Sequence, residues 1–387
     1  MACRFKSGSG YQQLICMNLI KNKITLLLWN VLYYLVYIVL LPLKILYAFK
    51  QNEVTKNLLA IEAGEVGWNK IDVKETYQSA IEFYGKERVT KVSIINKKFY
   101  ISEVIKNIKE QKITHYFYDP RSSDMENISS LITAIFLVPI FAFYNVTPIA
   151  ILPDFAYRKW RYQCAFLTMY SGFVISVLHN SETKRYFPHK RLMGPQMMPF
   201  SNQTIEKISH YIRAKKLNET IKINFTGSLY EPRKSKLELI RQKLKKEGIV
   251  LNINARDFGG KMIDDEDYWK NMVDADIVIT TADQYIGTNL DNLGEHLIYR
   301  YTEALACNTL LVAPIITGSQ RFIKNKVHYY GYKNIDEAVE IIKVLSSRPD
   351  VISTTSKNGH NRIKELVNTG VYWIQLEVLL KEKSVLK

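Results

Sequence analysis

Two glutamates and an arginine stand close together in the last third of the chain. Glu295 and Glu303 are eight residues apart, and Arg300 lies between them. On one continuous helix the two carboxylates would be separated by about 12 Å and about 80° of rotation, too far to share a ligand. Gly294 allows Glu295 to lie in a loop before the helix. Both carboxylates then face the start of that helix, where free N–H groups favour an anion.

The residues around Glu303 resemble a known motif. Glu303 opens Glu-Ala-Leu-Ala-Cys-Asn-Thr-Leu-Leu-Val-Ala, which is similar to the E-x7-E segment of family-4 glycosyltransferases with the GT-B fold. Asn308 replaces the usual glycine, and asparagine tolerates the same left-handed backbone. Arg300 and Glu303 also fit the R-x-x-E-A-L-A pattern of CgeB-like glycosyltransferases. The resemblance implies that Glu303 binds a nucleotide ribose, that Glu295 contacts the donor sugar as a catalytic residue, and that Arg300 belongs to the donor site.

A second motif begins the C-terminal half of the chain. Gly227-Ser-Leu-Tyr-Glu-Pro-Arg follows a predicted strand. By the same resemblance, it occupies the place of a loop that grips the donor diphosphate. Ser228 stands where the family carries arginine, and Arg233 where it carries lysine. A guanidinium binds two phosphate oxygens at once, so Arg233 is a competent replacement, with Lys234 or Lys236 as the second charge. The alternative is an ordinary type I turn with solvated basic residues.

Two further segments of the C-terminal half carry polar residues after strands. Arg256-Asp-Phe-Gly-Gly260 lies where the family binds the base, although a plain surface turn is the alternative. Asp265-Glu-Asp267 has the form of a metal-binding DxD motif, but it stands before a predicted helix, where acidic residues favour the helix start. The expected donor site therefore uses no metal and no cofactor.

The N-terminal half offers candidates for the acceptor side. Gly64 and Gly67 follow the first strand and let the backbone approach a ligand. Asp154 ends another strand, at the place where family members carry a His-Asp pair. The histidine of that pair is Pro153 here, so a catalytic histidine of this kind is missing. Asp154 is a candidate catalytic base or acceptor ligand, and a helix cap is the alternative.

Basic and histidine residues complete the N-terminal half. Arg158 and Arg161 belong to a basic cluster that suits anionic lipid or the diphosphate of a lipid-linked acceptor, with a solvated basic face as the equal alternative. His115 and His179 fall in predicted strands and are interpreted as core histidines.

The elements that position these residues alternate between strands and helices. The alternation runs from Leu58 to Leu178, pauses in a Pro/Gly-rich linker at 188–207, and restarts at Ile221. An α/β protein of the GT-B type is expected, with two Rossmann-like domains facing a central cleft and ligands at the carboxyl ends of the strands. The expected divisions are a basic segment 1–23, a membrane anchor 24–43, an acceptor domain 51–205, a nucleotide-sugar domain 215–350, and a helix 357–384 that crosses back.

The N-terminal segment is strongly apolar. Ile24 to Leu43 contains 20 residues without a charge, which as a helix matches the hydrocarbon thickness of a bilayer. This predicts a membrane-spanning helix, with a buried core helix or a helix lying in the interface as alternatives. A second run, Ile128 to Tyr144, contains Pro139 and is predicted to pack on a sheet. Asn224 opens a glycosylation sequon inside a predicted buried strand, which favours catalytic domains on the cytoplasmic face.

Composition narrows the classes of partner. The chain has 387 residues and a net charge of +16, which attracts polyanions, yet no nucleic-acid-binding motif is present. The four cysteines show no metal-ligand spacing and no disulfide framework.

We therefore expect a glycosyltransferase whose donor is a nucleotide sugar, with UDP as the expected nucleotide. Its expected acceptor is a glycan or glycolipid at the membrane, in the synthesis of a surface polysaccharide or glycoconjugate. The E-x7-E resemblance implies that the anomeric configuration is retained. A nucleotide-sugar epimerase and a non-catalytic GT-B scaffold are the alternatives.

Overall fold

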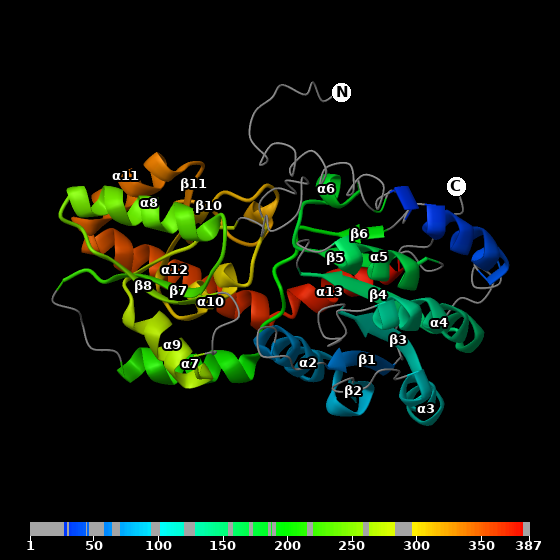
Figure 1. Cartoon of the computed structure of the whole chain (residues 1–387). Helices are drawn as coiled ribbons and strands as arrows, with labels where there is room; N and C mark the ends of the chain where they lie inside the picture. Colours follow the sequence, from blue (N-terminus) through cyan, green and yellow to red (C-terminus); the bar gives the residue numbers. More distant parts are fainter. Residues whose placement is uncertain are drawn as a thin grey trace, which may run out of the picture.

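The computed structural model shows two α/β domains side by side (Figure 1). It describes residues 27–28, 31–43, 45, 58–63, 70–93, 101–119, 128–153, 158–169, 173–184, 187, 191–214, 220–257, 263–282 and 296–381.

The N-terminal domain is built on a parallel sheet in the order β2-β1-β3-β4-β5-β6. Its strands are β1 (Leu58–Ala63), β2 (Val89–Ser93), β3 (Ile113–Tyr118), β4 (Thr147–Leu152), β5 (Phe173–Ser176) and β6 (Arg191–Met193). All six residues of β4 are buried, as expected for a central strand covered by helices on both faces. The helices are α2 (Lys70–Tyr84), α3 (Ile101–Gln111), α4 (Ile128–Tyr144), α5 (Arg158–Leu167) and α6 (Asn180–Lys184), with a 3-10 turn η2 (Lys86–Arg88).

The C-terminal domain has its own parallel sheet, in the order β11-β10-β9-β7-β8. Its strands are β7 (Ile223–Leu229), β8 (Leu251–Asp257), β9 (Ile277–Ile279), β10 (Leu310–Pro314) and β11 (Tyr330–Tyr332). The helices are α7 (Asn202–Ala214), α8 (Arg233–Lys246), α9 (Asp265–Asp274), α10 (Arg300–Ala306), α11 (Ile335–Ser346) and α12 (Pro349–Asn368), with a 3-10 turn η3 (Ser319–Arg321). The two sheets confirm the prediction of two α/β halves.

A side-chain cap fixes where helix α9 begins. Asp264 caps α9 by accepting a hydrogen bond from the Glu266 backbone N–H at 2.8 Å. Glu266 also pairs with Lys270 across one turn, at 2.7 Å. Of the predicted segment Asp265–Asp267, Glu266 thus supports the helix, and the capping side chain is that of Asp264, one residue before the segment.

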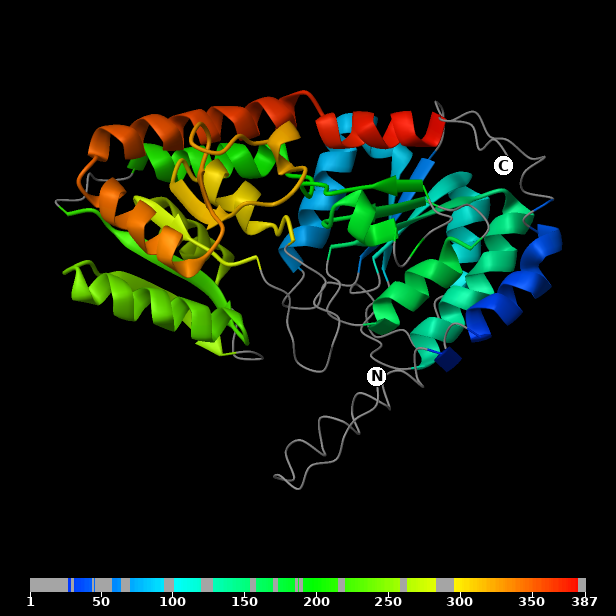
Figure 2. The same ribbon diagram turned by 90° about the horizontal axis from the view of Figure 1, so that it is seen from above.

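The last helix returns to the N-terminal domain. Gly370, with φ of +61°, separates α12 from α13 (Val371–Lys381). Tyr372 and Trp373 of α13 are buried in the same core cluster as strands β1, β3, β4 and β5. Figure 2 shows α12 and α13 running along one side of the molecule from one domain onto the other. The exact domain boundaries stay a prediction.

The predicted membrane-spanning helix over 24–43 is wrong. Within the described residues the helix covers 27–28, 31–43 and 45, and no described helix is both long and apolar enough to cross a bilayer. Part of its apolar surface serves protein packing instead. Tyr33, Val36 and Leu40 pack against Phe166 and Met169 at the end of α5. The interpretation of the second apolar run is confirmed, because α4 spans Ile128–Tyr144 beside the sheet.

Candidate functional site

The segment before α10 joins the two domains at the carboxyl ends of their sheets. The Leu297 N–H donates to the carbonyl of Val177, just after β5, at 3.1 Å. The hydroxyl of Tyr299 donates to the carbonyl of Pro199 in the interdomain linker at 3.2 Å. The first turn of α10 is thereby fixed against the N-terminal domain, at the edge where open α/β sheets bind ligands.

A buried charged group occupies this first turn. The Arg300 Nη1 lies 3.5 Å from the Glu303 carboxylate, and their side chains are 13% and 6% exposed. Nη1 also donates to the Tyr268 hydroxyl of α9, and the guanidinium lies 5.2 Å from the centroid of that ring. The carboxylate and the phenol therefore hold the guanidinium in one orientation.

The electrostatics of this group favour a charged arginine. Burial by itself would lower the pKa of Arg300, but Tyr268 and Glu303 outweigh it and hold that pKa above its ordinary value. Burial raises the pKa of Glu303, although Arg300 opposes the rise. In the structure the carboxylate of Glu303 pairs with Arg300. Its binding of a ribose stays a prediction.

Gly227 brings the other side of Arg300 to the end of β7. A Cβ atom on Gly227 would lie 3.0 Å from Nη2 of Arg300 and 3.3 Å from the Phe225 ring. Gly227 also has φ of +150°, a conformation that side chains rarely adopt. Only glycine therefore lets the guanidinium approach the strand this closely.

The side chain of Arg233, the first residue of α8, also lies near the end of β7. Its side chain is 8% exposed, with the Nε donating to Thr281 Oγ1 and Nη1 to the carbonyl of Ser228, each at 3.3 Å. The guanidinium stacks 4.3 Å from the centroid of Tyr230 and 5.9 Å from that of Phe225. Since Phe225 also borders Gly227, Arg233 and Arg300 both lie near the carboxyl end of β7.

The remaining predicted donor residues are less central. Ser228 is partly exposed and pairs across the sheet with Arg256, whose backbone alone is described. Lys234, the second residue of α8, is exposed.

Several predicted residues fall outside the described part of the chain. They are Glu295, Asp154, Gly64 and Gly67. Arg158 and Arg161 lie in the first turns of α5, and only their backbone is described.

The two histidines predicted to lie in strands, His115 and His179, differ in where the structure places them. His115 of β3 is 6% exposed, and burial lowers its pKa to about 4, so the prediction of a core histidine is confirmed. His179 lies beyond β5, and its predicted place within a strand is wrong. Its Cδ2 would lie 2.9 Å from a Cβ on Gly318, in the loop after β10, so it borders the other domain.

Contacts across the sequence hold the site in place, and the sequence motifs did not reveal them. Glu75 of α2 is 2% exposed and accepts hydrogen bonds from the Ser201 N–H (2.8 Å), the Ser201 hydroxyl (2.7 Å) and the Thr204 hydroxyl (2.6 Å). Glu82, two turns later, accepts from the N–H groups of Asn202 and Gln203. Two carboxylates of the N-terminal domain thus satisfy the free N–H groups at the start of α7.

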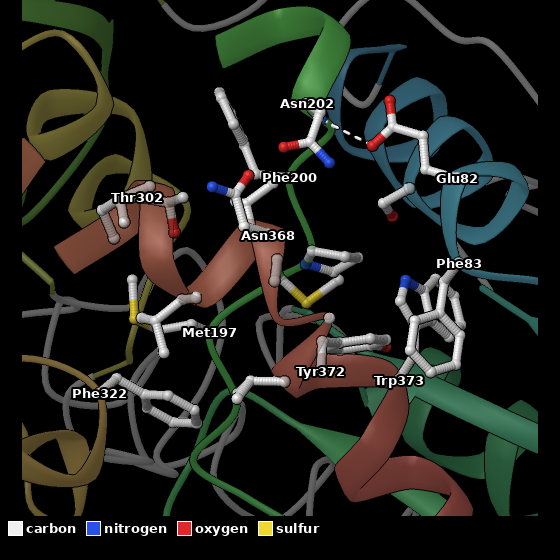
Figure 3. A pocket seen from close by; sticks show the side chains of 18 of the residues that line it. Glu82, Phe83, Met197, Phe200, Asn202, Thr302, Phe322, Asn368, Tyr372 and Trp373 are labelled. Atoms are coloured by element: carbon white, nitrogen blue, oxygen red, sulfur yellow. Dashed lines mark hydrogen bonds between the residues drawn. The ribbon is translucent and has the colours of Figure 1, made fainter. Parts of the chain in front are cut away.

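A cavity lies beside this junction (Figure 3). Its lining is contributed by α2, the linker, Thr302 of α10, Phe322, and the α12–α13 turn, and it contains none of the predicted donor residues. The cavity is therefore separate from the Arg233–Arg300 edge.

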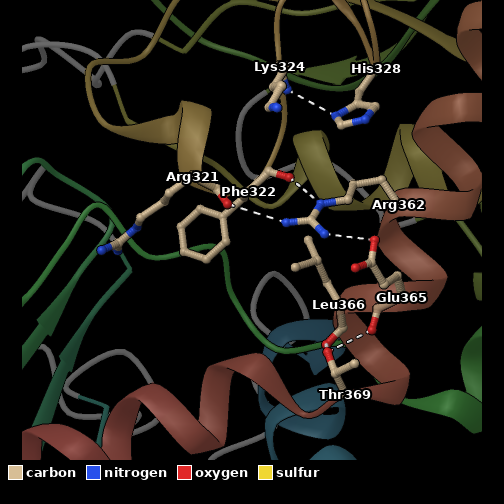
Figure 4. Close-up of polar contacts among 8 residues, drawn as sticks. All are labelled: Arg321, Phe322, Lys324, His328, Arg362, Glu365, Leu366 and Thr369. Carbon is tan, nitrogen blue, oxygen red and sulfur yellow. Dashed lines mark hydrogen bonds and ion pairs between the residues drawn. The ribbon is translucent and has the colours of Figure 1, made fainter.

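The loop after β10 is clamped between α12 and the linker. Arg362 of α12 donates to the carbonyl of Phe322 at 2.7 Å and pairs with Glu365 at 2.7 Å (Figure 4). Arg321 in that loop reaches the other way and donates to the carbonyl of Pro195 and to Gln196 Oε1. Burial lowers the pKa of Arg321.

Comparison with known proteins relates the C-terminal part of the chain to one family. The family model described as "Glycosyl transferase-like" matches residues 202–369, which hold β7, Arg233, Arg300 and Glu303. No curated protein sequence matches the chain.

Two solved structures are similar over both domains. Sucrose-phosphate synthase from Thermosynechococcus elongatus has a TM-score of 0.55 at 10% identity, covering 84% of this chain and 100% of that one. HepE from Anabaena, in complex with UDP and glucose, has a TM-score of 0.53 at 9% identity, covering 82% of this chain and 99% of that one. At such identities the likeness establishes the shared fold. Residues 202–369 are therefore similar to the glycosyl transferase-like family, and the chain shares its two-domain fold with these two structures.

Proposed function

We propose that this enzyme transfers a sugar from a UDP-sugar to a membrane-associated glycan or glycolipid acceptor, in the synthesis of a surface polysaccharide or glycoconjugate. The observation that carries the donor half is the pair of guanidiniums, Arg233 and Arg300, at the carboxyl end of β7. HepE, which shares the fold, binds UDP and glucose, and this supports UDP-glucose as the first donor to test.

The two arginines stabilise the leaving group in this proposal. The acceptor oxygen forms a bond to the anomeric carbon while the bond from that carbon to the diphosphate breaks. UDP leaves with the electron pair, and the guanidiniums bind the developing negative charge. The acceptor proton passes to a carboxylate, for which Asp154 and Glu295 are the candidates. Because fixed positive charge is already present, the reaction is proposed to need no metal or cofactor.

We propose the cytoplasmic face of a membrane as the place of work. Asn224, the first residue of a glycosylation sequon, is 1% exposed inside β7, so a glycan has no room there. Cys164 and Cys307 are buried and form no disulfide, which suits a reducing compartment.

The test is donor binding and turnover in matched arginine variants. Arg233→Met should weaken UDP binding about 10- to 100-fold, because a buried, charge-assisted hydrogen bond is lost. Arg241→Met on the same helix removes an exposed arginine that pairs with Glu238 and should bind UDP like the wild type. Calorimetric titration with UDP, and release of UDP from UDP-glucose with and without lipid-linked acceptors, measure the two halves. Equal loss in both variants, or UDP binding unchanged in Arg233→Met, would contradict the assignment.

A further inference from the structure

The N-terminal domain carries a broad apolar surface on the side away from the C-terminal domain. Residues 31–43 form a helix beside α4 and α5 there (Figures 1 and 2). Leu35, Ile38 and Val39 are 57%, 64% and 74% exposed, and Phe136 and Phe143 of α4 are 57% and 72% exposed. We call these residues, with Val31 and Leu32, the apolar face.

The apolar face gathers seven exposed apolar side chains on two elements. Phe136 and Phe143 are seven residues apart, so they share one side of α4. Ile135, next to Phe136, packs on Phe166 and Met169, the same two side chains that Tyr33 and Leu40 contact, so α4 and the helix of residues 31–43 share one packing cluster. Since the opposite side of that helix packs on Phe166 and Met169, the helix is apolar all round and only half of it is covered by protein. A contiguous apolar patch of this kind marks a contact with a partner or a lipid.

Charge distinguishes the possible occupants. The chain carries a net charge of +16, which repels a second copy and attracts an anionic lipid surface. Exposed lysines border the patch, because Lys109 at the end of α3 lies 5.9 Å from the ring of Tyr144, which contacts Phe143. Lys106, in the middle of α3, and Lys112, directly after its end, are exposed as well. The basic border and the apolar centre match the headgroup and acyl layers of a bilayer surface.

The packing of the helix fixes how it meets that surface. Tyr33 and Leu40, two turns apart, both contact the protein, so the helix axis runs along the domain. Along its length the uncovered side can therefore enter a lipid surface only to a shallow depth, of about 5–10 Å for interfacial helices.

We propose that the apolar face is a lipid-docking surface that lies in the interface of an anionic bilayer and holds the enzyme beside its membrane acceptor. This deepens the proposed function, because it names the surface on which the acceptor is met.

Flotation of the full-length protein with vesicles tests the proposal. Vesicles of phosphatidylcholine alone are compared with vesicles containing phosphatidylglycerol. The variant Ile38→Gln/Val39→Gln should reduce the bound fraction at least about tenfold, because two exposed apolar side chains no longer enter the lipid. Lys106→Gln/Lys109→Gln should reduce binding to the anionic vesicles roughly fivefold per lysine and leave neutral vesicles unaffected. The control Leu239→Gln/Val344→Gln changes two exposed apolar residues on helices of the C-terminal domain and should float like the wild type.

Three results would overturn the docking surface. The first is that the wild type does not float with vesicles, and the second is that Ile38→Gln/Val39→Gln floats as well as the wild type. The third is that light scattering shows a wild-type dimer and a monomeric variant, which would assign the face to a second copy of the chain. Thermal unfolding checks that each variant folds. Release of UDP from UDP-glucose without vesicles separates the two proposals, since a docking variant should keep this donor reaction. If the donor reaction is absent and flotation persists, the proposed transfer fails and the docking surface stands.

Discussion

The outer helices of the two domains differ in what they present to their surroundings. On the C-terminal domain, α8 and α11 exchange ion pairs, with Lys243 2.7 Å from Asp336 and Lys343 3.1 Å from Glu247. On the N-terminal domain, the helix of residues 31–43 presents aliphatic side chains in the corresponding outer layer. Two domains of the same architecture therefore differ in their outer layers, with ion pairs on the C-terminal domain and exposed apolar side chains on the N-terminal domain. Surface chemistry, more than topology, distinguishes the two halves of this protein.

The largest expected effect comes from removing the fixed charge of the donor domain. Arg300→Met should lower kcat/KM for transfer at least about 100-fold, because charge that stabilises the leaving group is lost. Arg300→Lys keeps the charge but loses the fork that Tyr268 and Glu303 orient, so it should recover only part of the activity. Steady-state kinetics with UDP-glucose measure both. Full activity in Arg300→Met would break the comparison, because the donor edge would then not depend on its buried arginine.

Substitution of two glycines tests the dependence of UDP binding on the position of Arg300, with a smaller expected effect. Gly227 and Gly248 both have positive φ, at +150° and +75°, but only a Cβ on Gly227 would meet Arg300. Gly227→Ala should weaken UDP binding about tenfold by displacing the guanidinium, since close packing transmits such shifts. Gly248→Ala has open space and should cost only about 1 kcal/mol of folding stability, with UDP affinity unchanged. Equal UDP affinities in the two variants would argue against a glycine requirement at β7.

The contact between the halves should respond to pH. Burial raises the pKa of Glu75 above its ordinary value of 4.5, so the folded protein binds this proton more tightly than the unfolded chain. The contribution of Glu75 to stability is thus full below pH 4.5 and declines as pH rises through the raised pKa. Glu75→Gln cannot titrate, so its melting temperature should fall less than that of the wild type over this rise in pH. Melting temperatures of the wild type and of Glu75→Gln are measured from about pH 4 to about pH 8. If the two change with pH in parallel, Glu75 does not titrate in the way described.

The smallest effect is expected at the outer face of the C-terminal domain. Lys243→Ala breaks an exposed ion pair and should cost less than about 1 kcal/mol of unfolding free energy, a difference that salt removes. Denaturant unfolding at low and high salt measures it. A larger, salt-resistant loss would mean that charged outer helices stabilise this domain more than surface pairs normally do.

Much of the fold could be read from the sequence because buried parallel strands are continuous apolar runs. The predicted alternation from Leu58 to Leu178 coincides with the stretch from β1 to β5, and its restart at Ile221 leads directly into β7. β6 was missed inside the predicted linker, since three residues that include Arg191 carry no such run. The first half of α12 was missed because its Ser-Thr-Thr-Ser segment favours helix weakly, and tertiary contacts decide it. A Cβ on Gly359, for example, would lie 2.7 Å from Leu305 of α10.

The site was predictable only where a local motif carries it. Arg233, Arg300 and Glu303 follow from motif spacing, although their roles stay a prediction. Tyr268 gave no such signal, because its contact with Arg300 joins α9 to α10, 32 positions apart. The spanning helix was predicted wrongly because hydropathy reports transfer out of water and does not distinguish lipid from the side of another helix.

The return of α13 to the first domain has a mechanical consequence. The polypeptide crosses between the domains twice, once in the linker near Pro199 and once at Gly370, and Arg191 ties the second crossing down by donating to the Leu379 carbonyl at 3.1 Å. A body held at two points can turn freely only about the line that joins them. Opening and closing of this enzyme should therefore be a single-axis swing, in which a twist of one domain against the other is blocked by the second attachment.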